Sequence, residues 1–171
     1  VVKFFVSEEV LPQTISLLKT RAIPLGIELV IGDHQDFEFS KEYFGAILQY
    51  PGKSGRVYNY NDFVAKCKAA DIKTVVAADI LSLVKLQAPG EMWVDVVVVT
   101  TQRLGTALGY GGTNNAYLAT KEGFIRNFTR RLISLNKDLN ATLAQQQALK
   151  TKYNTIKPDK DTSTNCTSQV I

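Results

Sequence analysis

The feature that most constrains the fold is the segment VDVVVVT, Val94–Thr100, in which valine fills positions 96 to 99 without interruption. Successive side chains of a strand point to opposite faces of the sheet, so a half-exposed strand alternates apolar and polar residues. A strand that is apolar on both sides belongs to the interior of a parallel sheet whose two faces are both covered. This segment therefore predicts an α/β fold.

Strand and helix patterns alternate along the rest of the first 135 residues. Apolar residues recur at helical spacing over residues 12–22 and 61–72, and a shorter helical piece is expected over 80–86. Strands that alternate with helices build right-handed β-α-β units, so we predict a partial doubly wound, mainly parallel sheet. The other expected strands are Val2–Ser7, Ile27–Asp33, Phe44–Pro51, Thr74–Asp79 and Asn115–Thr120.

The last third of the chain differs in composition. We expect residues 1–135 to form an α/β large-domain segment, in which KEGFIRNFTRRLIS, residues 121–134, resumes a helical pattern. Residues 136–171 are rich in Asn, Gln, Lys and Thr and are expected to form a polar connecting segment that leads into a next helix. Within it, ATLAQQQALKTKY at 141–153 is a candidate short helix, and NTIKPDKDTSTN at 154–165 is an expected loop.

Charge and hydropathy argue against two classes of partner. The net charge is +4, and residues 121–160 carry nine Lys or Arg against three Asp or Glu. This basic stretch holds three aromatic residues, too few for a platform on which bases stack, so we interpret it as a solvated face and expect no nucleic-acid partner. No apolar run reaches the roughly 20 residues that a membrane span needs, and we expect no membrane partner.

Polar residues follow two of the predicted strands. In doubly wound sheets, ligands bind at the carboxyl ends of the strands, where Asp79, Gln102 and Arg103 are expected. Asp79 can pair with a cation of a cofactor, or it can cap the next helix, which is the interpretation we favour. Arg103 can hold a carboxylate or phosphate with its bidentate fork, or it can bond a neighbouring loop or subunit. The glycines at 109, 111 and 112 precede a strand, which favours a tight turn over a phosphate cradle.

The sequence contains few residues that could act as nucleophiles or metal ligands. The single histidine, His34, is expected to be buried or solvated rather than catalytic, and one His with two Cys far apart makes no zinc site. Cys67 and Cys166 are expected as free thiols. One class of sheet enzymes carries a Schiff-base lysine just after such a valine strand, and no lysine is there in this sequence.

Several segments in order resemble one family. LPQTISLLKTRAIPLGIELVIGD, FGAILQYPGKSGRV, VVAADILSL, WVDVVVVTTQRLGTALGYGG, AYLATKE and TSTNCTSQV look like successive blocks of the glycine cleavage system P-protein. The resemblance covers nearly the whole chain and is to the amino-terminal half, or first subunit, of that family. It implies the large domain of fold type I pyridoxal-phosphate transferases, in a fragment of a longer protein.

The resemblance also implies a function. The complete enzyme releases carbon dioxide from glycine and passes the aminomethyl group to the lipoyl arm of the H-protein. Its cofactor, pyridoxal phosphate, is held by the partner catalytic half, and none is expected on this chain, because Gln102 stands where the lysine would be. The localisation implied is cytoplasmic in a bacterium and the mitochondrial matrix in a eukaryote. Contacts at the rim of the site or with a partner are expected at Asp79, Arg103, Tyr110, Thr162 and Ser163.

Two departures from the family pattern keep an alternative open. Gly112 is followed by Thr-Asn-Asn where the family usually has Pro-His, and residues 152–157 lack several charged and histidine positions. A diverged, non-enzymatic paralogue that acts as a binding scaffold is therefore the second interpretation. An unrelated nucleotide-binding module and a nucleic-acid binder are further alternatives.

Overall fold

The computed structural model describes residues 2–105, 116–121 and 123–124, together with the backbone of 132–137, 143–149 and 152–155. The chain divides into two compact units. The larger one contains Val1–Leu104 and Asn115–Thr120, and the smaller one contains Gly105–Asn114 and Lys121–Ile171. The division expected from the sequence, at residue 135, stays a prediction.

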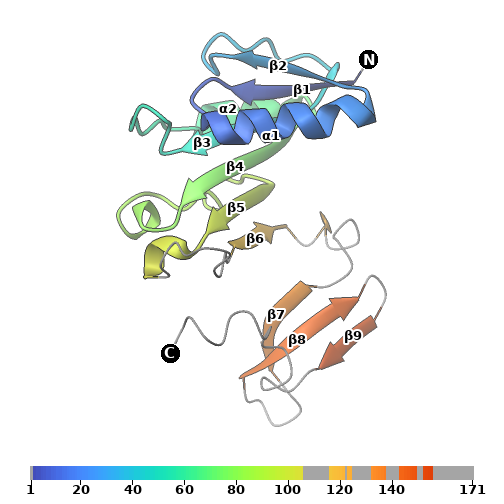
Figure 1. Cartoon of the computed structure of the whole chain (residues 1–171), viewed down its shortest axis with the longest axis vertical. Helices are drawn as coiled ribbons and strands as arrows, with labels where there is room; N and C mark the ends of the chain where they lie inside the picture. Colours follow the sequence, from blue (N-terminus) through green and yellow to red (C-terminus); the bar gives the residue numbers. More distant parts are fainter. Residues whose placement is uncertain are drawn as a thin grey trace. The chain divides into compact units, whose positions relative to one another are not determined.

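The larger unit is built on a six-stranded sheet with the order β2-β1-β3-β4-β5-β6 (Figure 1). The strands β1 to β5 run parallel to one another, and β6 runs antiparallel to β5. The predicted mainly parallel sheet is thus confirmed, and each strand lies within two residues of its predicted bounds. The strands are β1 Val2–Ser7, β2 Ile27–Gly32, β3 Tyr43–Tyr50, β4 Lys73–Asp79, β5 Val96–Thr100 and β6 Ala116–Thr120.

Two helices cover opposite faces of this sheet. The helix α1, Pro12–Ala22, connects β1 to β2, and α2, Asn61–Ala69, connects β3 to β4. On the α1 face, Ile15 and Leu18 pack against a buried cluster of Val6, Val10 and Ile47. On the other face a larger cluster takes in Phe63, Val64 and Cys67 of α2. Helices on both faces make the fold doubly wound, as the sequence predicts.

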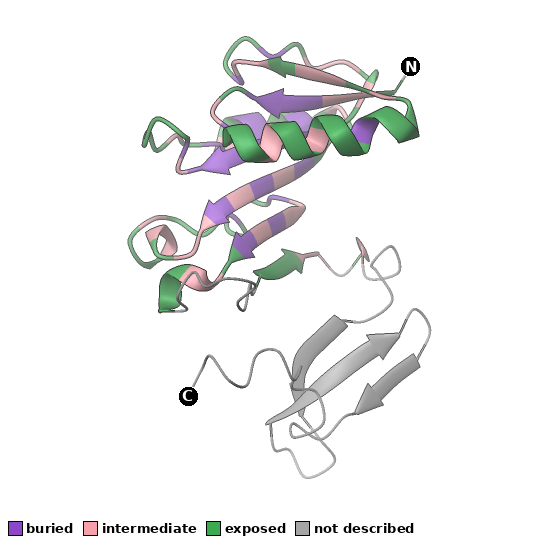
Figure 2. Cartoon of the chain, viewed as in Figure 1, coloured by how far each residue is buried: buried purple, intermediate pink, exposed green. Residues whose placement is uncertain are grey.

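The valine strand lies in the sheet interior but is not equally buried on its two sides. Val97 and Val99 are 7% and 3% exposed and belong to the core on the α2 face. Val96 and Val98 point to the opposite face and are only half-buried (Figure 2). The expected interior position is correct, because β5 pairs with both β4 and β6, but β6 is antiparallel and full burial is reached only on the α2 face.

The helix ends and turns of the larger unit lie where the sequence predicts them. The helix α1 begins at Pro12, whose missing N–H would have no partner in a first helical turn. It ends at Ala22 and passes into the short 3-10 helix η1, Ile23–Leu25. Gly26 then turns the chain into β2 with a φ of +64°, in the left-handed region that favours glycine. The helical piece expected over 80–86 is a single 3-10 turn, η2, Ser82–Val84.

The helix predictions are wrong for residues 132–134 and for the described part of 141–153. Residues 132–134, expected to be helical, open the strand β7, Leu132–Lys137. The candidate short helix at 141–153 instead contains β8, Leu143–Leu149, and the start of β9, Lys152–Thr155. These strands form an antiparallel sheet in the order β7-β8-β9. Helix propensities differ by only tenths of a kcal/mol between ordinary residues, so strand pairing readily overrides them.

Candidate functional site at the carboxyl edge of the sheet

The parallel strands direct their carboxyl ends to one edge, and the connections change direction there. From β1 the chain passes through α1 to β2 on one side, whereas from β3 it passes through α2 to β4 on the other. The sheet order therefore reverses between β1 and β3, which are neighbours. In open α/β sheets the crevice at such a reversal is where ligands bind.

Asp79 and Arg103 meet at this edge. Asp79 ends β4, Arg103 lies in the 3-10 helix η3, Gln102–Leu104, just after β5, and Nη2 of Arg103 lies 3.6 Å from Oδ2 of Asp79. The other carboxylate oxygen of Asp79 accepts a hydrogen bond from the backbone N–H of Leu81 at 3.1 Å. Asp79 thus supports the turn before η2, although it is not the N-cap residue, which is Leu81. The chain brings two of the expected rim residues together.

The remaining expected site residues can be placed only in part. Gln102 is the first residue of η3, directly beyond the end of β5. No lysine occurs in the sequence between Lys85 and Lys121, so the segment directly beyond β5 offers a guanidinium and an amide but no amine. Tyr110, Thr162 and Ser163 lie outside the described residues, and their roles stay predictions.

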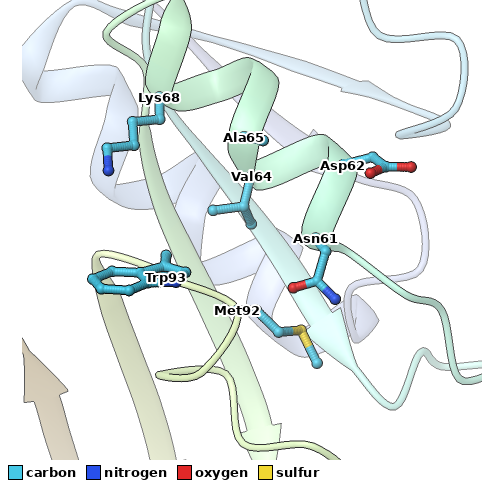
Figure 3. A pocket seen from close by; sticks show the side chains of 7 residues that line it. All are labelled: Asn61, Asp62, Val64, Ala65, Lys68, Met92 and Trp93. Carbon is cyan, nitrogen blue, oxygen red and sulfur yellow. The ribbon is translucent and has the colours of Figure 1, made fainter.

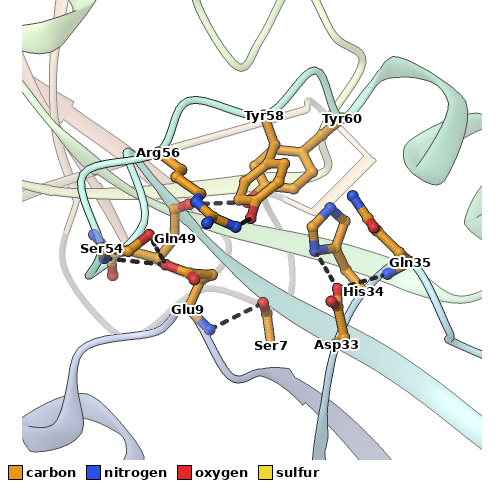
Figure 4. A network of polar contacts seen from close by, with 10 residues as sticks. All are labelled: Ser7, Glu9, Asp33, His34, Gln35, Gln49, Ser54, Arg56, Tyr58 and Tyr60. Carbon is orange, nitrogen blue, oxygen red and sulfur yellow. Dashed lines mark hydrogen bonds and ion pairs between the residues drawn. The ribbon is translucent and has the colours of Figure 1, made fainter.

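A polar network occupies the ends of β1, β2 and β3, which sequence reasoning did not single out (Figure 4). We call it the Glu9 network. The carboxylate of Glu9 accepts hydrogen bonds from the backbone N–H of Ser54 at 3.1 Å and from its hydroxyl at 2.8 Å. The backbone N–H of Lys53 donates to the Glu9 carbonyl at 2.8 Å. The residues of the network are Ser7, Glu9, Asp33, His34, Gln35, Gln49, Ser54, Arg56, Tyr58 and Tyr60.

These bonds change the acidity of Glu9. The hydroxyl and the N–H of Ser54 stabilise the ionised carboxylate, and they hold the pKa of Glu9 below its usual value. Arg56 lies in the same loop and donates to the hydroxyl of Tyr58 at 3.4 Å. The loop after β3 is therefore tied to the end of β1 by charge-assisted hydrogen bonds.

His34 lies in the aromatic part of this network. It is 9% exposed, and its ring meets those of Tyr58 and Tyr60 edge-on, with centroids 4.6 and 5.1 Å away. Its Nδ1 lies 3.1 Å from Oδ1 of Asp33, in an alignment that falls short of a hydrogen bond. The buried alternative of the two expected for His34 is correct.

Tyr60 and Cys67 are buried groups without the environment of a nucleophile. The hydroxyl of Tyr60 donates to the backbone carbonyl of Gln49 at 3.1 Å, and burial raises the pKa of Tyr60. Burial also raises the pKa of the Cys67 thiol to about 12, and this thiol is free. Among the described residues, no group of three or more His, Cys, Asp or Glu is placed to hold a metal ion. The described helices also include none long and apolar enough to span a bilayer.

Comparisons with known proteins agree with this arrangement. The family model described as "Glycine cleavage system P-protein" matches residues 1–171. The chain belongs to the glycine cleavage system P-protein family. A glycine dehydrogenase (decarboxylating) of Christiangramia forsetii is 61% identical over 169 residues, which are 99% of this chain and 18% of that protein. The chain thus spans about 18% of the length of that P-protein relative.

Solved structures support the same fold. A crystal structure of glycine decarboxylase, the P-protein, in inhibitor-bound form superposes with a TM-score of 0.73 at 27% identity, covering 86% of this chain and 35% of that one. An O-acetylhomoserine (thiol)-lyase of Campylobacter jejuni, solved with N'-pyridoxyl-lysine-5'-monophosphate, superposes with a TM-score of 0.58 at 16% identity. That match covers 71% of this chain and 31% of the lyase. The P-protein segment thus has the fold of the large domain of fold type I pyridoxal-phosphate enzymes.

Proposed function

We propose that this P-protein segment is part of a glycine dehydrogenase (decarboxylating) and belongs to the half that holds no cofactor. The complete enzyme releases carbon dioxide from glycine and passes the aminomethyl group to the lipoyl arm of the H-protein. Its partners would be the catalytic half of the P-protein and the H-protein. Membership of the family over the whole chain supports the first part of this proposal.

The observation that carries the second part is the identity of the residues after β5. Pyridoxal phosphate joins fold type I enzymes through a lysine amine, and the segment beyond β5 offers Gln102 and Arg103 instead. An amide nitrogen is not nucleophilic enough to take the place of an amine. The described residues directly beyond β5 therefore do not fit a covalently held cofactor, and we derive no chemical step from them.

Asp79 and Arg103 would then serve as rim residues. Arg103 is largely exposed, and its ion pair with Asp79 in the described part of the chain is as long as 3.6 Å, so its guanidinium can turn toward a carboxylate on a partner. This role rests on position and charge alone. It predicts an effect on turnover without an effect on cofactor content.

The complete P-protein that contains this segment provides the test. Glycine-dependent release of carbon dioxide, measured with H-protein present, should fall several-fold in Arg103→Gln. Bound pyridoxal phosphate, measured by its visible absorbance, should not change. Arg21→Gln is the matched control, because Arg21 lies in the last turn of α1, away from the strand ends. Loss of cofactor in parallel with activity in Arg103→Gln would contradict the rim assignment, and a wild-type protein that releases no carbon dioxide would contradict the function itself.

A further inference from the structure

A groove unrelated to the carboxyl edge runs along α2. It has a volume of about 400 Å³ and lies between the helix and the turn that precedes β5 (Figure 3). Val64 and Met92, each 3% exposed, are its buried apolar residues, and Trp93 forms one wall. The lining residues are Asn61, Asp62, Val64, Ala65, Lys68, Met92 and Trp93.

Trp93 is unusual in two independent ways. Its side chain is 67% exposed although it is the single tryptophan of the chain. Its backbone has a φ of +61°, a conformation that bulky residues rarely adopt. Strained residues of this kind persist where the surrounding structure holds them, and they gather at ligand sites.

The groove is also polarised. The ammonium of Lys68 lies over the indole of Trp93, 5.6 Å from the ring centroid. Asp62 lies six residues earlier on α2, so the acid is about 9 Å away along the helix axis. In the described part of the chain, Lys68 makes no ion pair with a carboxylate, whereas Lys73 pairs with Asp71. Asp62 in the first turn of α2 and Lys68 in its last turn are both stabilised by the helix dipole. The helix dipole does not explain why the indole of Trp93 lies beside Lys68.

We propose that this groove binds a small planar carboxylate, with the ring of the ligand against Trp93 and its carboxylate on Lys68. The volume suffices for a one-ring ligand, since an apolar cavity of about 150 Å³ already holds benzene. Aromatic rings gain from offset or edge-on contact with an indole, and a cation beside the ring selects for an anion. Asp62 at the far end of the groove would repel the carboxylate of a ligand bound in the reverse orientation.

The test uses the complete P-protein that contains this segment, and the emission of Trp93 is taken as the difference between the wild type and Trp93→Phe. Benzoate should quench or shift this emission saturably, with a Kd of about 1 mM, as suits a ligand with one ring and one charge contact. Benzylammonium, which has the same ring and the opposite charge, should bind at least fivefold more weakly. Equal binding of the two probes, or quenching by benzoate that never saturates, would overturn the proposal.

Two lysine variants distinguish binding of benzoate in the groove from a general effect of positive charge on α2. Lys68→Met keeps the apolar stem and should weaken benzoate at least fivefold. Lys66→Met removes an ammonium from the same helix, over Phe39 at 5.7 Å, and should leave benzoate binding unchanged. In the wild-type protein, the methyl resonances of Val64, Ala65 and Met92 should shift on titration with benzoate, a result that does not depend on how well any variant folds. The Trp93 emission of the wild type could instead depend on protein concentration and not respond to benzoate. That result would mean that a second copy covers the groove, and the proposal would fail.

Discussion

Glu9 and Ser54 lie 45 residues apart in the chain, yet the carboxylate of Glu9 accepts both the backbone N–H and the hydroxyl of Ser54. This pair joins the end of β1 to the loop after β3. It lies where the sheet order reverses, so it determines how the two strand ends are held at the carboxyl edge.

The first prediction is that Ser54→Ala raises the pKa of Glu9. The folded-state pKa of Glu9 is lowered chiefly by the Ser54 hydroxyl, and the variant loses that donor. A lowered pKa means that the carboxylate stabilises the fold above the pKa of an unfolded glutamate, and that this stability is lost as the pH falls through the lower folded value. An NMR titration of the Glu9 carboxyl carbon measures the shift. An identical titration in both proteins would show that the bond does not form.

Gly52→Ala should disturb the same contact. A Cβ at residue 52 would lie 2.5 Å from Oε2 of Glu9 and 3.1 Å from its Cβ, so the carboxylate must move away from Ser54. We expect a loss of about 1 kcal/mol in the free energy of unfolding, the usual size of one hydrogen bond. Urea denaturation of Gly52→Ala, Ser54→Ala and the double variant checks this. Fully additive losses would contradict a shared contact.

A pair of glycine variants separates backbone strain from steric contact. Gly26 has a φ of +64°, in the left-handed region, whereas the φ of Gly90 lies outside that region. An added Cβ would meet no atom within 4 Å at either position. Gly26→Ala should therefore lower the free energy of unfolding by about 1 kcal/mol, because a left-handed conformation is costly for alanine. Gly90→Ala should be close to neutral. Equal effects of the two variants on the denaturation midpoint would contradict the φ assigned to Gly26.

The thiol of Cys67 should be inert in the folded protein. It is fully buried, and its pKa is raised to about 12, so very little thiolate exists near neutral pH. Iodoacetamide at pH 8, followed by peptide mapping, should leave Cys67 unmodified in buffer and modify it in denaturant. Mapping is needed because Cys166 is a second cysteine. Rapid alkylation of Cys67 in buffer would mean that α2 is not packed as described.

Local sequence patterns predict most of the main sheet. Most of its strands end beside a turn former or a charged residue, such as Pro51 or Asp79, and the apolar runs are long enough to show their period. The segment at 143–149, LAQQQAL, has no such period, and its pairing with β7 depends on residues of a separate segment, Leu132–Lys137. The helix expected there is wrong because long-range pairing is not visible in local propensity.

The candidate site is predictable to the same extent. Asp79 and Arg103 could be placed together because both directly follow buried strands. Glu9 and Ser54 could not, because their meeting requires β1 to pair with β3 rather than only with β2, and no local pattern fixes that order. The motif around Ser54 reads only as a turn in the sequence.

The measurement that tests the central claim most directly is the position of the cofactor lysine in the complete P-protein. The protein is purified with bound pyridoxal phosphate, reduced with borohydride to fix any lysine adduct, digested and mapped by mass spectrometry. We predict that the pyridoxyl-lysine maps to a peptide outside these 171 residues. A pyridoxyl group on any lysine of this chain would contradict the assignment of this segment, with Gln102 beyond β5, to the half that holds no cofactor.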